Sequence, residues 1–147
     1  MKKLDLSKIL KIALIFLGAL ILVLAIFVCL KVKIDAKSAL REAKNVRMAL
    51  RVVDIEMYAQ EKCVFDVTKK DGVANGVKES VRKLADPDGT YIINSYNYKT
   101  HEITSLTYKV KNYYVFFTKE DDAITWDVKY MLGVYHFDET DTKIVKK

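Results

Sequence analysis

The chain has few of the residues that break or cross-link a fold: its 147 residues include one proline, five glycines, two cysteines and two histidines. Neither glycine nor proline occurs between Ala19 and Asp71, so no residue in that stretch forces a helix to end. Cys29 and Cys63 are expected in separate regions, beyond the roughly 4–7 Å Cα separation that a disulfide needs. A disulfide framework is therefore excluded.

Residue patterns typical of catalysis or metal binding are also missing. His101 and His136 stand in no metal-ligand spacing, so we expect surface or sheet histidines. Cys63 has no signature of a catalytic thiol, the serines lack a nucleophile elbow, and the acidic turns do not match an EF-hand loop. We predict a non-enzymatic protein with no catalytic residues, no cofactor and no metal site.

The chain has one long apolar run. Residues 12–30 contain no charge, no amide and no proline, and fourteen of the 19 are Leu, Ile, Val or Phe. As a helix with a rise of about 1.5 Å per residue the run covers roughly 28 Å, close to the roughly 30 Å hydrocarbon core of a bilayer. The insertion free energy of these side chains is about −4 to −8 kcal/mol. We predict a transmembrane helix over 12–30, preceded by a basic tail over 1–11.

A cleaved secretory signal is the alternative for this run, but such signals are shorter and end in small residues. Val28, Cys29 and Leu30 offer no such cleavage site, so we expect a retained, single-pass anchor in the cell membrane. Lysines flank the run on both sides, at positions 2, 3, 8 and 11 and at 31, 33 and 37. The positive-inside rule therefore assigns no orientation.

The net charge of +6 is concentrated beside the apolar run. Residues 1–37 hold seven lysines and two aspartates, a charge of +5, whereas residues 38–61 sum to 0 and residues 62–147 to +1. Basic residues beside a membrane are attracted to anionic headgroups by about 1 kcal/mol each. The charge thus predicts a membrane as partner and no nucleic acid.

After the apolar run the hydrophobic residues become periodic, which predicts a nearly continuous helix from about residue 7 to 61. Seven of them recur at spacings of 3 and 4 and form a helix packing face: Ala36, Ala39, Ala43, Val46, Leu50, Val53 and Met57. Six charged residues are expected on the opposite, solvated side: Arg41, Glu42, Lys44, Arg47, Arg51 and Asp54.

The helix packing face has two candidate partners. It is either a coiled-coil seam or the face that packs on the chain's own sheet. Its first three members are alanines and it lasts only about three heptads, which is short for a coiled coil. We favour packing on the sheet.

The remainder of the chain predicts an antiparallel sheet. A short helix is indicated by Val77, Val81 and Leu84, and twelve of the sixteen aromatic residues fall between positions 91 and 137, which is typical of strands. Short polar separators favour hairpins. We expect strands near residues 90–98, 102–110, 112–118, 123–130 and 133–138.

The expected fold is α+β. A long N-terminal helix, a membrane span that continues into an amphipathic half, packs on a C-terminal antiparallel sheet of about 4–5 strands. The extramembrane domain covers residues 31–147, divided into a helix (31–61), a connecting segment (62–89), the sheet (90–138) and a charged tail (139–147).

The strand over residues 113–117 is apolar on both faces. Either Tyr113, Val115 and Phe117 or Tyr114 and Phe116 can pack on the helix, and the other set needs a separate cover. The cover could be a loop, residues 62–89 or a neighbouring molecule, and we favour a loop over a subunit interface. Tyr114 and Phe116 are the candidate partner face.

In its layout the chain resembles type IV pilins and the related pseudopilins of type II secretion, from its apolar run to its C-terminal sheet. Residues 39–43 (ALREA) and 46–50 (VRMAL) look like the sheet-facing half of the pilin helix, and residues 89–93, 103–108 and 113–117 look like its strands. Two family features are missing: the processing glycine after a short leader and the glutamate within the apolar segment. The resemblance therefore implies an unprocessed, membrane-retained relative.

The resemblance implies an accessory or assembly subunit of a pilus or type II secretion-like system. Its partners would be pilin-like or secretion-system subunits, and its C-terminal domain would lie outside the cytoplasm. The alternative is a membrane-anchored, extracytoplasmic binding or sensory domain that acts alone and contacts its ligand through the sheet.

Overall fold

The computed structural model describes residues 6–121, 123–130, 133–137 and 144–145. The chain divides into two compact units, Met1–Asp35 and Ala36–Lys147, and the boundary falls within the first helix, α1 (Leu6–Tyr58). We call residues 6–35 of α1 its apolar segment and residues 36–58 its domain segment. Each is described by itself.

In the apolar segment the large side chains face outward. Leu14, Phe16 and Phe27 are 70%, 72% and 68% exposed. An 18-residue window of mean hydropathy 3.2 contains no residue buried within the chain. By length and composition α1 can cross a membrane, which makes it a candidate single transmembrane helix.

The C-terminus of α1 lies three residues earlier than predicted, at Tyr58 instead of residue 61. The amides of Glu61 and Lys62 donate to the carbonyls of Tyr58 and Met57 at 2.9 and 3.0 Å, and Glu61 is left-handed, with φ of 58°. A left-handed residue closes a helix, and it is usually glycine. A non-glycine residue in this role leaves no signal in the sequence.

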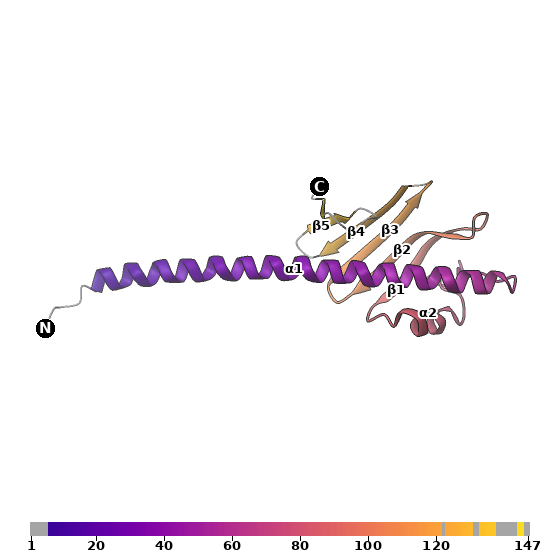
Figure 1. Cartoon of the computed structure of the whole chain (residues 1–147), viewed down its shortest axis with the longest axis horizontal. Coiled ribbons are helices and arrows are strands. Elements are labelled where there is room, and N and C mark those ends of the chain that lie inside the picture. Colours follow the sequence, from indigo (N-terminus) through magenta and orange to yellow (C-terminus); the bar gives the residue numbers. More distant parts are fainter. Residues whose placement is uncertain (1–5, 122, 131–132, 138–143, 146–147) are drawn as a thin grey trace. The chain divides into compact units, whose positions relative to one another are not determined.

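The predicted α+β fold, with a long helix packed on an antiparallel sheet, is confirmed. The strands follow one another across the sheet in chain order, and each pairs antiparallel with the next (Figure 1). They are β1 (Thr90–Asn97), β2 (Glu102–Val110), β3 (Tyr113–Glu120), β4 (Ala123–Tyr130), β5 (Gly133–Phe137) and β6 (Ile144–Val145).

Three strand boundaries differ from the predictions. Tyr98 lies in a turn because the Asn97 side chain accepts hydrogen bonds from the amides of Lys99 and Thr100, which ends β1. Asn112 also lies in a turn, and β3 extends to Glu120. Strand β6 falls in the segment expected to be a charged tail, where two apolar residues among lysines are too few to predict a strand. Asp138 lies outside the described residues.

The first three hairpins share one backbone feature. His101, Lys111 and Asp121 have φ of 51°, 51° and 52°, and each stands one or two residues before the next strand. The left-handed conformation is uncommon for residues other than glycine, and asparagine and aspartate tolerate it best. The turns are therefore held by strand pairing on both sides and not by glycine chemistry.

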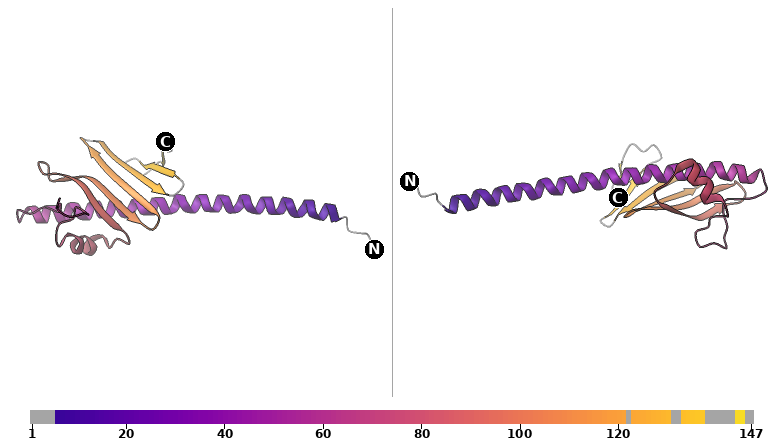
Figure 2. Two further views of the ribbon diagram at one scale, coloured as in Figure 1. Left: turned by 180° about the vertical axis from the view of Figure 1, so that it is seen from behind. Right: turned by 90° about the horizontal axis from the view of Figure 1, so that it is seen from below.

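The core of the domain lies between the domain segment of α1 and one face of the sheet. Figure 2 shows the strands crossing one side of this part of α1. Trp126 is 2% exposed, and Tyr113, Val115 and Phe117 are 5%, 1% and 1% exposed. These three residues are therefore the inward-facing set of β3.

The connecting segment packs into the same core. It contributes Val64 and Val73 from the loop and Val77 and Val81 from helix α2 (Val77–Ala85), whereas Leu84 is 56% exposed. Because these residues lie on the helix side of the sheet, they do not cover the opposite face. The favoured cover for Tyr114 and Phe116 was wrong: these side chains remain 39% and 37% exposed.

Gly72 is one position of this segment that requires glycine. Gly72 has φ of 64°, and a Cβ added to it would lie 2.1 Å from the carbonyl oxygen of Ile93. The neighbouring Asp71 accepts a hydrogen bond from the amide of Ile93 through its own carbonyl oxygen, at 2.9 Å. The close approach joins the loop to β1.

Candidate functional site

The residues predicted as the helix packing face lie in the core of the domain. Ala36, Ala39, Ala43, Val46, Leu50 and Val53 are at most 2% exposed, and Met57 is partly buried against the same cluster. Because the chain's own strands cover these residues, the face is not free to form a coiled-coil seam.

A second apolar stripe on the domain segment of α1 remains uncovered. Met48, Val52 and Ile55 are 67%, 45% and 65% exposed and are spaced by 4 and 3 residues, so they share one side of the helix. Leu84 of α2, 56% exposed, lies beside them in an open groove of about 610 Å³. We call these four residues the outer stripe.

The outer stripe differs from the scattered apolar residues that every protein surface carries. Its members line one groove, which Asn45, Ala49, Arg51 and Ala85 complete. A contiguous apolar surface with a polar rim is typical of an interaction site. This stripe was not predicted, although its spacing of 4 and 3 residues is visible in the sequence beside the more regular alanine-led face.

The charged side predicted for α1 is only partly solvated. Tyr108 donates a hydrogen bond from its hydroxyl to Glu42 at 2.8 Å, and the cations of Lys44 and Arg47 lie over the rings of Trp126 and Phe117. These contacts let long charged side chains border the core while their stems cover apolar surface. Burial, followed by the hydrogen bond to Glu42, raises the pKa of Tyr108 well above its usual range.

Asp54 is the clearest correction on that side, because it is 4% exposed and not solvated. Its carboxylate accepts hydrogen bonds from the Tyr96 hydroxyl at 3.0 Å and from the Val64 amide at 3.3 Å. Burial and this carboxylate together raise the pKa of Tyr96 well above its usual range. Asp54 thus ties α1 to β1 and to the connecting segment.

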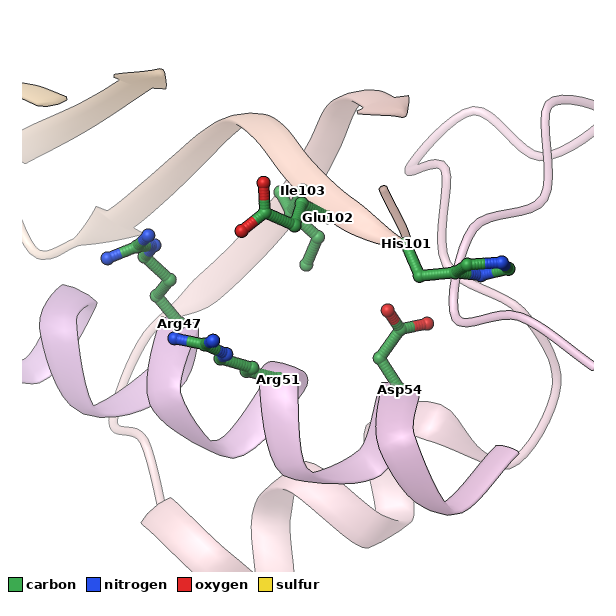
Figure 3. Close-up of a pocket in the computed structure, with 6 residues that line it drawn as sticks. All are labelled: Arg47, Arg51, Asp54, His101, Glu102 and Ile103. Carbon is green, nitrogen blue, oxygen red and sulfur yellow. The ribbon is translucent and has the colours of Figure 1, made fainter. Parts of the chain in front are cut away.

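A small polar cavity opens beside Asp54. Figure 3 shows Arg47, Arg51 and Asp54 projecting from α1 toward His101, Glu102 and Ile103 at the start of β2. Its volume of about 30 Å³ suits a water molecule or two and no larger ligand. The His101 ring also contacts the Tyr58 ring, with centroids 4.3 Å apart and ring planes tilted by 54°. The cluster is therefore a joint between helix and sheet.

Cys63 is bound into the loop that follows α1. Its thiol donates to the Phe65 carbonyl at 3.0 Å, and burial raises the pKa of the thiol. A thiol kept protonated is a poor nucleophile. Among the residues that the structure describes, no group of three or more His, Cys, Asp or Glu side chains is placed to hold a metal ion.

Tyr114 and Phe116, the predicted partner face, lie on the outer face of the sheet. Their rings are nearly parallel, at 12°, with centroids 6.5 Å apart. Tyr114 stands in register between Lys109 of β2 and Lys129 of β4. A shallow hollow of about 370 Å³ adjoins these rings, bordered by Asn112, Lys129 and Tyr130.

The outer stripe between α1 and α2 and the aromatic pair on the sheet are therefore both uncovered surfaces of the domain. His136 lies in β5, whose backbone alone is described.

Comparisons with protein-family models, curated proteins and solved structures found no match to this chain.

Proposed function

We propose that this chain is a single-pass membrane protein whose domain acts as a pilin-like accessory or assembly subunit of a pilus or type II secretion-like system. The observation that carries the proposal is the outer stripe. A helix that only supports its own sheet needs one apolar face, and the domain segment of α1 has two. The second face is suited to another subunit.

The arrangement of the chain supports the same proposal. A candidate membrane-spanning segment and an outward apolar stripe belong to one helix, α1, and a sheet packs on its domain segment. This is the layout in which the sequence resembles pilins and pseudopilins. We propose that the domain lies outside the cytoplasm and that subunits associate in the cell membrane.

Site-specific cross-linking tests the association. In a background with Cys29→Ser and Cys63→Ser, single cysteines are introduced as Met48→Cys and Val52→Cys, and membranes are treated with a thiol cross-linker. We expect covalent dimers or higher adducts at both positions because the outer stripe is buried between subunits. Thr68→Cys, on an exposed loop of the connecting segment, is the matched control and should stay monomeric.

A second substitution distinguishes a specific interface from random encounters between subunits in the membrane. Ile55→Asp, added to the Val52→Cys variant, should abolish the adducts because a carboxylate in an apolar interface loses its hydration. If the variants with cysteine at positions 48 and 52 give only monomers, although their thiols label fully, the proposal is contradicted.

A membrane-impermeant thiol reagent tests the placement of the domain. Labelling of Thr68→Cys in intact cells would support the extracytoplasmic placement, and protection from labelling would contradict it.

The second candidate function is a membrane-anchored binding domain that acts alone. It is favoured by the exposed pair Tyr114 and Phe116, which assembly along the outer stripe does not use. A strictly monomeric protein that binds a ligand through its sheet would favour this function over assembly.

A further inference from the structure

We propose that the outer face of the sheet binds an acidic polysaccharide, whose anionic groups pair with Lys109 and Lys129 and whose sugar rings stack on Tyr114 and Phe116. This inference extends the second candidate function. It does not depend on association along the outer stripe, so either proposal can fail while the other stands.

The two lysines provide the charge that the ligand must complement. Both are exposed, and neither forms an ion pair with a residue that the structure describes. Since they flank Tyr114 on adjacent strands, their Cα atoms are separated by two strand spacings, roughly 10 Å. The Lys109 ammonium lies 5.3 Å from the Tyr114 ring centroid, which holds it at the sheet surface.

The aromatic pair provides a platform of matching shape. Tyr114 and Phe116 alternate with inward residues on one strand, so both rings stand on the same face, nearly parallel and 6.5 Å apart. The C–H face of a sugar ring is apolar and covers an aromatic ring, while its hydroxyls stay at the edge. Asn112 borders this platform with an amide that can hydrogen bond to those hydroxyls.

The spacing of charge along the face favours a polysaccharide over a nucleic acid. Across β2, β3 and β4, the row of residues beside the lysines contains Thr107, Phe116 and Asp127, and none of these three is a cation. A single-stranded nucleic acid has a phosphate at every nucleotide and would bring one close to Asp127. A polysaccharide with a carboxylate on alternate sugars can place its charge at the lysines and neutral hydroxyls beside Asp127.

The polar end of the same face is unsuited to a lipid surface. Asn94 donates to Thr107 at 2.7 Å, and Ser105, Thr118 and Thr125 continue the outer face away from the lysines. Insertion among acyl chains would strip water from these hydroxyls. They are instead compatible with a hydroxyl-rich ligand.

Binding of the full-length protein in zwitterionic nanodiscs tests the proposal. The probes are hyaluronate, with one carboxylate per disaccharide, and polygalacturonate, with dextran as the neutral control; the readout is a dissociation constant from interferometry. We expect saturable binding of at least one acidic polymer that weakens with salt, and no binding of dextran. Failure of both acidic polymers, or equal binding of dextran, would overturn the proposal.

Matched variants assign the binding to this face. Lys109→Gln with Lys129→Gln, and separately Tyr114→Thr with Phe116→Thr, should each weaken binding about tenfold or more. Lys70→Gln with Lys99→Gln removes the same charge from exposed positions elsewhere and should change affinity less than about twofold. Far-ultraviolet circular dichroism checks that each variant keeps its fold.

Three further outcomes would contradict the proposed site or the proposed ligand. If the Lys70 and Lys99 variant loses as much affinity as the sheet variant, binding follows net charge and the site is wrong. Tighter binding of an oligothymidylate, or binding only to nanodiscs that contain anionic lipid, would assign the face to a nucleic acid or to the membrane and overturn the polysaccharide.

Discussion

The apolar segment and the domain segment of α1 share one secondary structure and differ in what surrounds their side chains. In the first, Phe16 and Phe27 are 72% and 68% exposed; in the second, Leu40 and Leu50 are 0% exposed. The difference follows from pattern and not from composition alone. A segment that is apolar on all sides needs an apolar solvent, whereas a segment with apolar stripes needs neighbours on particular sides.

The comparison also shows that the domain segment is not fully satisfied by its own chain. Its alanine-led face is covered by the sheet, but its outer stripe still resembles the apolar segment in exposure. One helix thus has a core around part of its domain segment and, in our proposal, a bilayer around its apolar segment and another subunit at its outer stripe. Substitutions that change one surrounding and not the others test this division.

The largest effect is expected from charges in the apolar segment. Leu20→Arg with Val23→Arg should cost about 6–8 kcal/mol of insertion free energy, which cancels the gain of about −4 to −8 kcal/mol from the apolar run. The variant should leave the carbonate-resistant membrane fraction. The matched pair Leu20→Phe with Val23→Ile should remain there. If the arginine variant stays in membranes at the wild-type level, this segment is not the anchor.

Next in size is a cavity beneath the sheet. Leu50→Ala should lower the free energy of unfolding by about 2–5 kcal/mol because Leu50 is fully buried. Met48→Ala, two positions away on the outer stripe, should change it by less than about 0.5 kcal/mol in the monomer. The single tryptophan, buried Trp126, reports urea unfolding in detergent by its fluorescence. If both variants lose the same free energy of unfolding, the two faces of the helix do not differ in burial as described.

A smaller effect is expected at the joint between helix and sheet. Asp54→Ala should destabilise the domain by about 2–4 kcal/mol, because the Val64 amide and the Tyr96 hydroxyl lose their acceptor in a buried place. Asp54→Asn keeps one acceptor oxygen and should lose less. Urea unfolding measures both. If Asp54→Ala is as stable as the wild type, the carboxylate does not tie these elements together.

The smallest effect is expected at the Asp71–Lys78 ion pair, whose atoms lie 2.5 Å apart at the surface. The hydrogen bond from Lys78 lowers the pKa of Asp71, so its contribution is present above the unfolded pKa of about 4 and is lost as pH falls through the lower folded value. Lys78→Ala should cost at most about 1 kcal/mol at neutral pH. Urea unfolding at pH 7 and pH 3 should show that difference shrink; an unchanged difference would contradict the assignment.

The sequence predicted the architecture well because two of its patterns are physically unambiguous. Strands β1 to β5 were found within one to two residues at most boundaries, since alternation fixes which residues point inward. The alanine-led face was found because its spacing is regular over 22 residues. At Asp54 and Met48 the pattern was ambiguous. A single sequence did not show whether other residues would pack against these side chains or leave them exposed.

Of the two uncovered surfaces, the aromatic pair was predicted from the sequence and the outer stripe was not. Tyr114 and Phe116 were identified because a strand with two apolar faces leaves one of them over. Their flanking lysines come from β2 and β4, so only the strand register brings Lys109 and Lys129 together. The outer stripe likewise needs Leu84, which belongs to another helix.

The chain-order arrangement of the sheet has a consequence for biosynthesis. The domain segment of α1 leaves the ribosome before the sheet does, and Val128, one of the residues that complete its core, is made 71 positions after Met57. At about 5–20 residues per second, the alanine-led face waits roughly 4–14 s for its cover. Because alanine side chains are small, they limit the apolar surface that the helix exposes to aggregation during that interval. The alanines thus have a role before the native state forms.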